Sequence, residues 1–223
     1  MNLLALDTAG QGCSVALLAG GRVIERHEST PRRHAASLLP MAEACLAEAG
    51  VGLAELDAVA FGRGPGSFTG LRIATGVAQG IAFGADLPVV PVSNLAAAAA
   101  AAFRLHGWRR AVAAFDARMG EIYAGVFGID AAGLPEALGA EALLAPDALA
   151  APAGEGACGV GSAFAAWPML AGRLGLEQVD AELAPLARDL LGLAAAGFAR
   201  GEAVAAHEAL PVYLREQVAW RSA

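Results

Sequence analysis

The sequence predicts an α/β protein of two similar lobes, each a mixed sheet flanked by helices. Apolar runs and helix-period segments in the first half follow in the order strand, strand, strand, helix, strand, helix, strand, helix. A strand–aspartate–turn–strand pattern then occurs twice, as LLALDTAGQGCSVAL from residue 3 and VAAFDARMGEIYAGV from residue 112. This internal repeat favours a duplicated domain, and the alternative is a chance match between alanine-rich strands.

The expected elements of the first half follow from hydrophobic period and turn residues. A turn-rich stretch separates the first two strands and predicts a hairpin. Pro31 introduces the first helix, and Gly50 and Gly52 end it. Strands are expected at Leu3–Leu6, Cys13–Ala19, Arg22–Ser29, Leu56–Phe61 and Leu87–Val92, and helices at His34–Ala49, Thr69–Gly84 and Asn94–Leu105. In the second half, Val112–Phe115 and Glu121–Phe127 form the repeated hairpin.

Composition excludes several classes of protein. The chain has 223 residues, 57% of them hydrophobic and 17% charged, so intrinsic disorder is excluded. All 15 basic residues are arginine, which removes any Schiff-base lysine and the lysine of a P-loop. A net charge of −7 argues against autonomous nucleic-acid binding, although a local arginine cluster in a larger complex stays open.

The sequence also indicates where the protein resides. The longest apolar stretch is interrupted by prolines, so we expect no membrane span. The three cysteines are scattered without a CxxC pair, and the N-terminus has no charged-then-apolar signal segment. We therefore expect reduced thiols and a cytoplasmic protein.

Two aspartates occupy equivalent places in the repeat. Asp7 and Asp116 each end a strand and enter a turn. Facing turns of two lobes would bring both carboxylates to one cleft, where they could hold a metal-bound water or position a phosphate. The alternative for each is an Asx turn, in which the carboxylate accepts backbone N–H groups.

A glycine-rich loop is the sharpest local motif. GPGSFTGLR, residues 64–72, lies between a strand and a helix, and free N–H groups at such a place can bind an anion. The alternative is a tight turn with Ser67 or Thr69 as N-cap. Together Asp7, Thr8, Gly64, Gly66, Ser67 and Asp116 would line a vestigial nucleotide cleft.

The helix after this loop carries two rows of small residues. The first row is Gly66, Gly70, Ala74, Ala78 and Ala82, and the second is Gly76, Gly80 and Gly84. Interior glycine costs about 1 kcal/mol relative to alanine, so a close backbone approach is expected on at least one face. Either one row faces a partner helix or both pack internally. The four histidines form no metal-ligand spacing, so we expect no metal.

Five segments resemble the TsaB (YeaZ) family and cover most of the chain. They are ALDTAGQGCSVAL (residues 5–17), RRHAASLLPMAEACL (32–46), GRGPGSFTGLRIATGVAQGIAFGADLPVVPVSNLAA (62–97), FDARMGEIYAGVF (115–127) and PVYLREQVAW (211–220). Residues 130–200 resemble the family only loosely.

The resemblance implies a fold of two ribonuclease-H-like lobes, of the actin/hexokinase/Hsp70 (ASKHA) type. It places an N-terminal lobe at residues 1–104 and a C-terminal lobe at 105–223, whose last segment could pack back on the first lobe. It also implies a non-catalytic relative of the transferase TsaD that works with TsaD and the ATPase TsaE. Their product is threonylcarbamoyl on N6 of adenosine 37 in tRNAs that read ANN codons, so tRNA is bound only within the complex.

One departure from the catalytic relative supports a non-catalytic role. TsaD carries a VNHxxGH-type segment with two metal-binding histidines, and here VSNLAAA places Asn94 and Ala98 at those positions. Alanine cannot ligate a metal, so ATP and metal are expected on partner subunits and no cofactor on this chain.

The family pairs through its first two helices, in homodimers and in heterodimers with TsaD. Carried onto this chain, the resemblance implies these contacts: Leu38, Met41, Ala42, Cys45, Gly70, Ala74, Val77, Ala78 and Ile81. The favoured function is thus a scaffold subunit that binds and activates TsaD. The alternatives are an ATP-dependent phosphotransferase of the same fold and a glycoprotease-like metallopeptidase.

Overall fold

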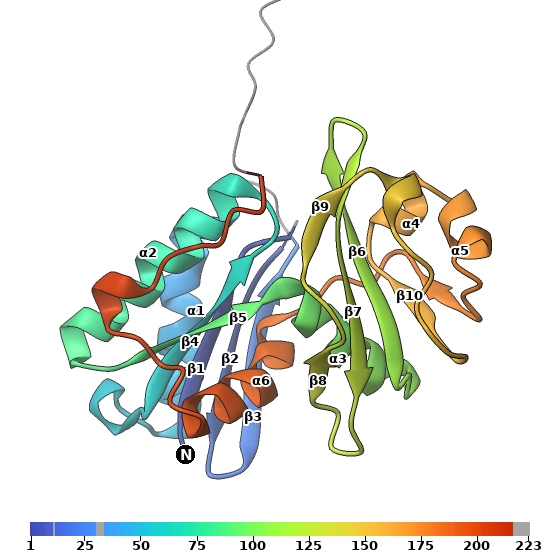
Figure 1. Cartoon of the computed structure of the whole chain (residues 1–223). Coiled ribbons are helices and arrows are strands. Elements are labelled where there is room, and N and C mark those ends of the chain that lie inside the picture. Colours follow the sequence, from blue (N-terminus) through green and yellow to red (C-terminus); the bar gives the residue numbers. More distant parts are fainter. Residues whose placement is uncertain (11, 30–33, 216–223) are drawn as a thin grey trace, which may run out of the picture.

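Two sheets of the same topology organise the molecule. The computed structural model describes residues 1–10, 12–29 and 34–215. The strands of the first sheet are β1 (Leu3–Asp7), β2 (Cys13–Ala19), β3 (Arg22–Glu28), β4 (Ala58–Gly64) and β5 (Val89–Ser93). Those of the second are β6 (Arg110–Arg118), β7 (Glu121–Ile129), β8 (Pro135–Ala137), β9 (Ala142–Leu144), β10 (Cys158–Val160) and β11 (Val179–Asp180). Figure 1 shows the two sheets side by side.

The order and direction of the strands confirm the duplication. The first sheet runs β3-β2-β1-β4-β5 and the second β8-β7-β6-β10-β11, with β9 added to β7. In each, the first strand pairs antiparallel with the hairpin strand and parallel with the strand after the first crossover. The sheets place Asp7 and Asp116 at equivalent positions, as the sequence repeat predicts. The protein has two ribonuclease-H-like lobes.

The helices largely match the sequence expectation. They are α1 (His34–Ala49), α2 (Phe68–Ala85), α3 (Asn94–His106), α4 (Ala163–Ala166), α5 (Met169–Arg173) and α6 (Ala187–Ala199), with short 3-10 turns η1 (Leu53–Glu55), η2 (Pro146–Ala148) and η3 (Ala206–Glu208). Strand β4 begins at Ala58 rather than Leu56, because Leu56 closes the turn η1. Pro31 and residues 216–220 of the terminal motif lie outside the described residues.

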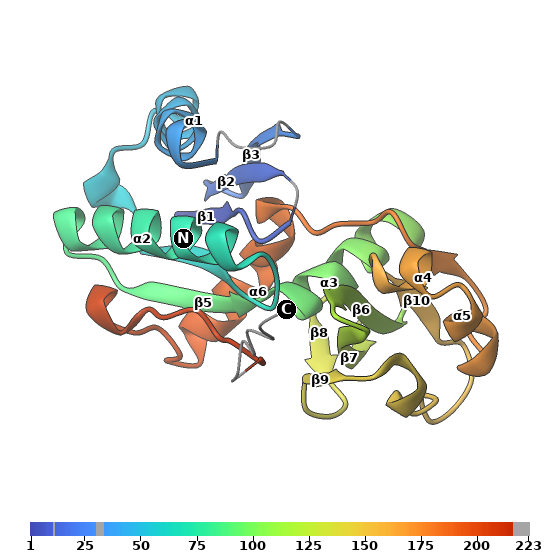
Figure 2. The same cartoon turned by 90° about the horizontal axis from the view of Figure 1, so that it is seen from above.

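Helices cover both sheets, and α4 and α5 pack on the second sheet with Val112 and Ile122. Helices α1 and α2 pack on one face of the first sheet with Leu4, Val15 and Phe61, and α6 packs on the other face with Leu3 and Ala5. Figure 2 shows the first sheet between these two layers. Helix α3 packs mainly on the second sheet, through alanines that meet Ala111, Ala113 and Phe127. No helix in the described part of the chain is long and apolar enough to span a membrane.

The chain crosses between lobes more than once. Helix α6 follows the second sheet in sequence but covers the first. Residue 204 then pairs with Val89 at the edge of β5, and the segment beyond it runs along α2, where Gln79 Nε2 donates to the Ala209 carbonyl at 2.9 Å. Arg215 ends this segment on the second lobe, where Nη2 donates to the Ala117 carbonyl at 3.2 Å. The domain boundary after residue 104 stays a prediction.

Candidate functional site

A buried polar cluster lies where β1, β4 and α3 meet. Asp7 ends β1 and is 4% exposed, and Asn94 starts α3 and is 1% exposed. The Asn94 Nδ2 donates to Asp7 Oδ1 at 2.6 Å, while Asn94 Oδ1 accepts the Gly64 N–H at 2.8 Å. A Cβ on Gly62 would lie 2.1 Å from Asp7 Oδ1, so this strand position has room only for glycine. One amide thus joins three elements.

The environment of Asp7 makes it a titratable group near neutral pH. Burial raises the pKa of its carboxyl to about 6, although hydrogen bonds from Asn94 and from the Ala9 N–H lower the pKa in part. The hydrogen bond from the Ala9 N–H forms the Asx turn that the sequence analysis gives as the alternative role of Asp7.

The glycine loop is closed against the turn after β1. Gly66 and Gly70 face this turn so closely that an added Cβ would lie 2.7 Å from the Ala9 oxygen and 1.9 Å from the Thr8 oxygen, respectively. The Thr8 hydroxyl donates to the Gly70 carbonyl at 2.6 Å, and the Ser67 N–H donates to the Ala9 carbonyl at 2.8 Å. These glycines are therefore explained by close backbone packing.

The start of α2 has the N-cap that the tight-turn interpretation of the loop predicts. Ser67 is the N-cap, with its Oγ accepting the Gly70 N–H at 3.3 Å. The N–H groups of Gly64, Ser67 and Gly70 are all given to protein acceptors. These three N–H groups are therefore not free to bind an anion at this loop.

Asp116 is held by partners of its own lobe. Its Oδ1 accepts the Arg118 N–H at 2.8 Å, its Oδ2 lies 3.1 Å from Arg118 Nη1, and its own N–H donates to Ser162 Oγ at 3.1 Å. Among the described residues, none of these partners belongs to the cluster around Asp7. The structure therefore assembles Asp7, Thr8, Gly64, Gly66 and Ser67, and leaves Asp116 in a separate Asx turn.

The two positions that the resemblance aligns with metal-binding histidines lie in different surroundings. Asn94 is the amide of the Asp7 cluster. Ala98 is fully buried and packs in the core beneath the second sheet. Across residues 1–10, 12–29 and 34–215, no three His, Cys, Asp or Glu side chains are grouped to hold a metal ion.

The second candidate site is the outward face of α1 and α2. The row Gly70, Ala74, Ala78 and Ala82 is buried on the sheet side of α2. Residue 76 is rotated by about 200° from residue 74 on a helix of 3.6 residues per turn. Accordingly Gly76, Gly80 and Gly84 are exposed, and a Cβ at each would meet nothing within 4 Å.

Most of the residues whose partner contacts the resemblance implies lie in the interior of their own lobe. The following residues are buried in their own lobe: Leu38, Met41, Ala42, Cys45, Gly70, Ala74, Ala78 and Ile81. Val77 is partly buried on the same core. Both helices use these positions to cover the sheet, and the partner contacts that the resemblance implies for them stay a prediction. The exposed side of α1 instead carries Leu39, Glu43, Ala44 and Ala47.

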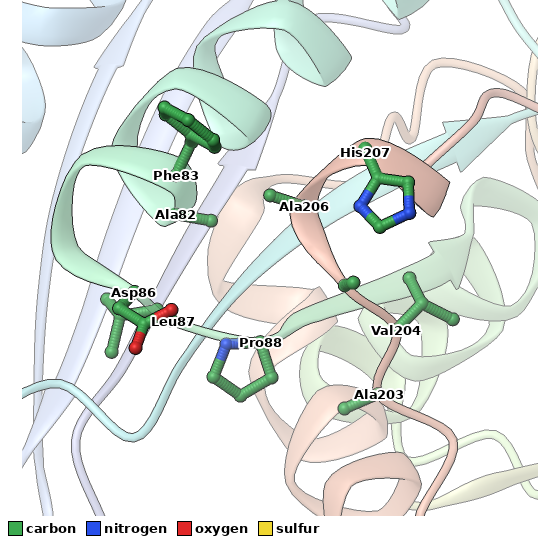
Figure 3. A pocket seen from close by; sticks show the side chains of 10 residues that line it. Ala82, Phe83, Asp86, Leu87, Pro88, Ala203, Val204, Ala206 and His207 are labelled. Atoms are coloured by element: carbon green, nitrogen blue, oxygen red, sulfur yellow. The ribbon is translucent and has the colours of Figure 1, made fainter.

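A residue that the sequence reasoning missed stands at the end of the glycine row. Phe83 lies between Gly80 and Gly84 and is 84% exposed. It borders a groove of about 500 Å³ between the C-terminal end of α2 and residues 203–207, with Asp86 and His207 at its rim (Figure 3). An aromatic residue between two glycines of the helix was the signal available in the sequence.

Fold and site together define a class: a two-lobed protein of the ASKHA type whose cleft loop is closed by its own backbone and whose helix pair presents a glycine-lined surface. The family model for TsaD, tRNA N6-adenosine threonylcarbamoyltransferase, matches residues 25–161. Two relatives, both titled tRNA threonylcarbamoyladenosine biosynthesis protein TsaB, match almost end to end. The Escherichia coli protein is 44% identical over 99% of this chain and 97% of its own, and the Haemophilus influenzae protein 41% over 99% and 96%.

A solved structure agrees. YeaZ from Pseudomonas aeruginosa superposes with a TM-score of 0.89 and 48% identity, covering 96% of this chain and 99% of its own. The chain belongs to the TsaB (YeaZ) family. The chain is also similar to the tRNA N6-adenosine threonylcarbamoyltransferase of Chromobacterium violaceum over a shorter stretch. This match is 44% identical and covers 30% of this chain and 20% of that protein.

Proposed function

We propose that this protein is a non-catalytic scaffold subunit of the assembly that makes threonylcarbamoyladenosine in tRNA. It binds and activates the transferase TsaD, and TsaE and tRNA join only within the assembly. The titles of its full-length relatives support the role in this modification. The observation that carries the scaffold role is the exposed row Gly76, Gly80 and Gly84 on α2.

The glycine row suits a helix partner. Without side chains, the backbone of α2 can be approached closely along one line of its surface, and Phe83 offers an aromatic anchor at one end. Aromatic side chains, phenylalanine among them, are enriched at protein–protein interfaces. The transferase, or a second copy of this chain, would lay a helix along this row. The partner shifts toward its active form only if it binds this face more tightly in that form.

The cleft supports the absence of chemistry on this chain. Asp7 accepts from the Asn94 amide, the Thr8 hydroxyl donates to the Gly70 carbonyl, and the Gly64 N–H donates to Asn94 Oδ1. We propose that ATP and metal are bound by the partner subunits, which leaves this chain to position them.

Co-expression with the cognate transferase tests the proposal. We expect a complex that co-purifies and is required for threonylcarbamoyl transfer to tRNA. The variant Gly76→Leu places a side chain on the outward row without an internal clash and should weaken the complex at least about tenfold, which is about 1.4 kcal/mol. The matched control is Gly172→Leu, another exposed helical glycine with open space, on α5 of the second lobe. Normal complex formation by a folded Gly76→Leu protein would overturn the assignment of this face.

The enzyme alternatives are tested on the isolated chain. A phosphotransferase would bind Mg·ATP and turn over, and a metallopeptidase would cleave peptide substrates. Calorimetry with Mg·ATP that shows no heat, together with no peptide cleavage, supports the scaffold role. Turnover by the pure chain would contradict it.

A further inference from the structure

We propose that the cavity between α3, α6 and the β7–β8 loop binds a small carboxylate carried on a flat apolar body. The cavity has a volume of about 480 Å³, within the range of about 300–1,000 Å³ usual for small-molecule sites. Its wall is mostly apolar, and its polar groups are two arginines and one aspartate.

Arg104 supplies the recognition group. Its Nε donates to Asp189 Oδ1 at 2.7 Å and its Nη2 to Asp189 Oδ2 at 3.1 Å. The Asp189 side chain is 2% exposed and is fixed in turn by the Leu186 N–H at 2.9 Å. Two of the five N–H donors of the guanidinium are used in these bonds. Within the described residues the remaining edge of Arg104 has no protein acceptor, so a rigid, two-donor edge is available to a carboxylate.

Phe103 supplies a flat surface for the ligand body. A Cβ on Gly133 would lie 2.6 Å from its ring, so the loop backbone packs directly on it and fixes its position. The guanidinium of Arg109 lies over the same ring at 5.8 Å. Leu134 and Leu193 complete the apolar wall. An aromatic or cyclic body bonded to one carboxylate meets both requirements.

The local charges tolerate an anion. Asp189 is engaged by Arg104, and Glu25 accepts from Arg188 Nη1 at 2.9 Å. The side chains of Arg188 and Glu25 are 34% and 41% exposed, and such pairs hold their geometry weakly, so Arg188 can turn toward a bound anion.

The site is independent of the proposed partner face. Helix α6 covers the face of the first sheet opposite to α1 and α2. The cavity is lined by α3 and α6 and by the loop between β7 and β8. A bound ligand would therefore contact both lobes. Failure of this proposal would leave the scaffold role untouched, and the reverse also holds.

Three probes separate the two features of the ligand. Phenylacetate carries both the ring and the carboxylate, phenylacetamide only the ring, and acetate only the carboxylate. Calorimetry or ligand-observed NMR on the full chain should show millimolar or tighter binding of phenylacetate, the range expected for a fragment of this size. Phenylacetamide and acetate should bind at least about tenfold more weakly, because each lacks one of the two contacts. Absence of phenylacetate binding, or equal binding of phenylacetamide, would overturn the proposal.

Two variants locate the site. Gly192→Leu fills the cavity from α6 at a position where an added Cβ meets nothing within 4 Å, so the protein stays folded and should lose binding. Arg104→Lys keeps a positive charge beside Asp189 but lacks the planar second edge, and should weaken binding about tenfold. Gly172→Leu, outside the cavity, should bind normally. Undiminished binding by Arg104→Lys, or by a folded Gly192→Leu protein, would place the ligand elsewhere.

Discussion

A single buried amide, that of Asn94, connects three elements of the two lobes' junction. Its Nδ2 donates to the buried Asp7, and its Oδ1 accepts the Gly64 N–H. Because both of its polar atoms are satisfied inside the protein, the junction of β1, β4 and α3 becomes a structural cluster. Removal of the amide would leave the Asp7 carboxylate buried with one partner fewer.

The pKa of Asp7 gives a prediction about stability and pH. The folded protein raises this pKa from 3.8 to about 6, so folding favours the protonated form. The stability from this group is complete below about pH 4 and is lost as the pH rises through about 6. Two pKa units correspond to about 3 kcal/mol.

The variant Asp7→Asn removes this titration. The free energy of unfolding of wild type should fall relative to the variant by up to about 3 kcal/mol between about pH 4 and about pH 8. Urea unfolding of both proteins across this range measures the difference. A difference that does not change with pH would show that Asp7 does not titrate as its burial requires.

Helix α2 illustrates how one element serves two faces. Its buried row packs on the sheet and on the turn after β1, and its exposed row carries no side chain at all. A side chain at a glycine of the buried row would clash with the packed interior, whereas a side chain at the exposed row would enter open space. The sequence alone does not distinguish the two rows.

Two alanine substitutions in α2 test this difference. Gly76→Ala adds a methyl group in open space and should stabilise the protein by up to about 1 kcal/mol, since alanine is the better helix former. Gly70→Ala would place a Cβ 1.9 Å from the Thr8 oxygen and should destabilise by about 1–3 kcal/mol or more. Chemical denaturation of the pair measures both effects. Equal shifts for the two variants would contradict the assignment of faces.

The sequence predicted those elements whose signal is local. The hairpin of β1 and β2, the loop before α2 and the repeat after residue 112 all depend on neighbouring residues, and the structure confirms them. The outward row of α2 was not predictable, because rows of glycine and alanine have no contrast in hydrophobicity. Asp7 and Asn94 are 87 residues apart in the sequence, so no short-range pattern predicts their hydrogen bond. The packing of α6 on the first sheet also depends on contacts between residues far apart in the sequence, so local patterns do not predict it.

At the scale of the whole molecule, the two lobes share their cores. Helix α6, from the second half of the chain, buries Leu190, Leu191 and Ala194 against the first sheet. Ala187 N–H also donates to Ser14 Oγ of β2 at 2.9 Å. A fragment that ends at residue 104 would therefore expose one face of its sheet. The lobes are expected to unfold together, although each has the topology of a separate unit.

Equilibrium unfolding by two probes tests this coupling. The three tryptophans stand at 108, 167 and 220, so fluorescence reports on the second half of the chain and far-ultraviolet circular dichroism on the whole. We expect coincident urea transitions. Leu190→Ala, at a fully buried position of α6, should destabilise by about 2–5 kcal/mol and move both signals equally. Leu210→Ala, at a side chain 63% exposed, is the control and should change stability by less than about 0.5 kcal/mol. Two separate transitions, with Leu190→Ala moving only the circular dichroism signal, would show that the lobes fold independently and that α6 is not a shared part of their cores.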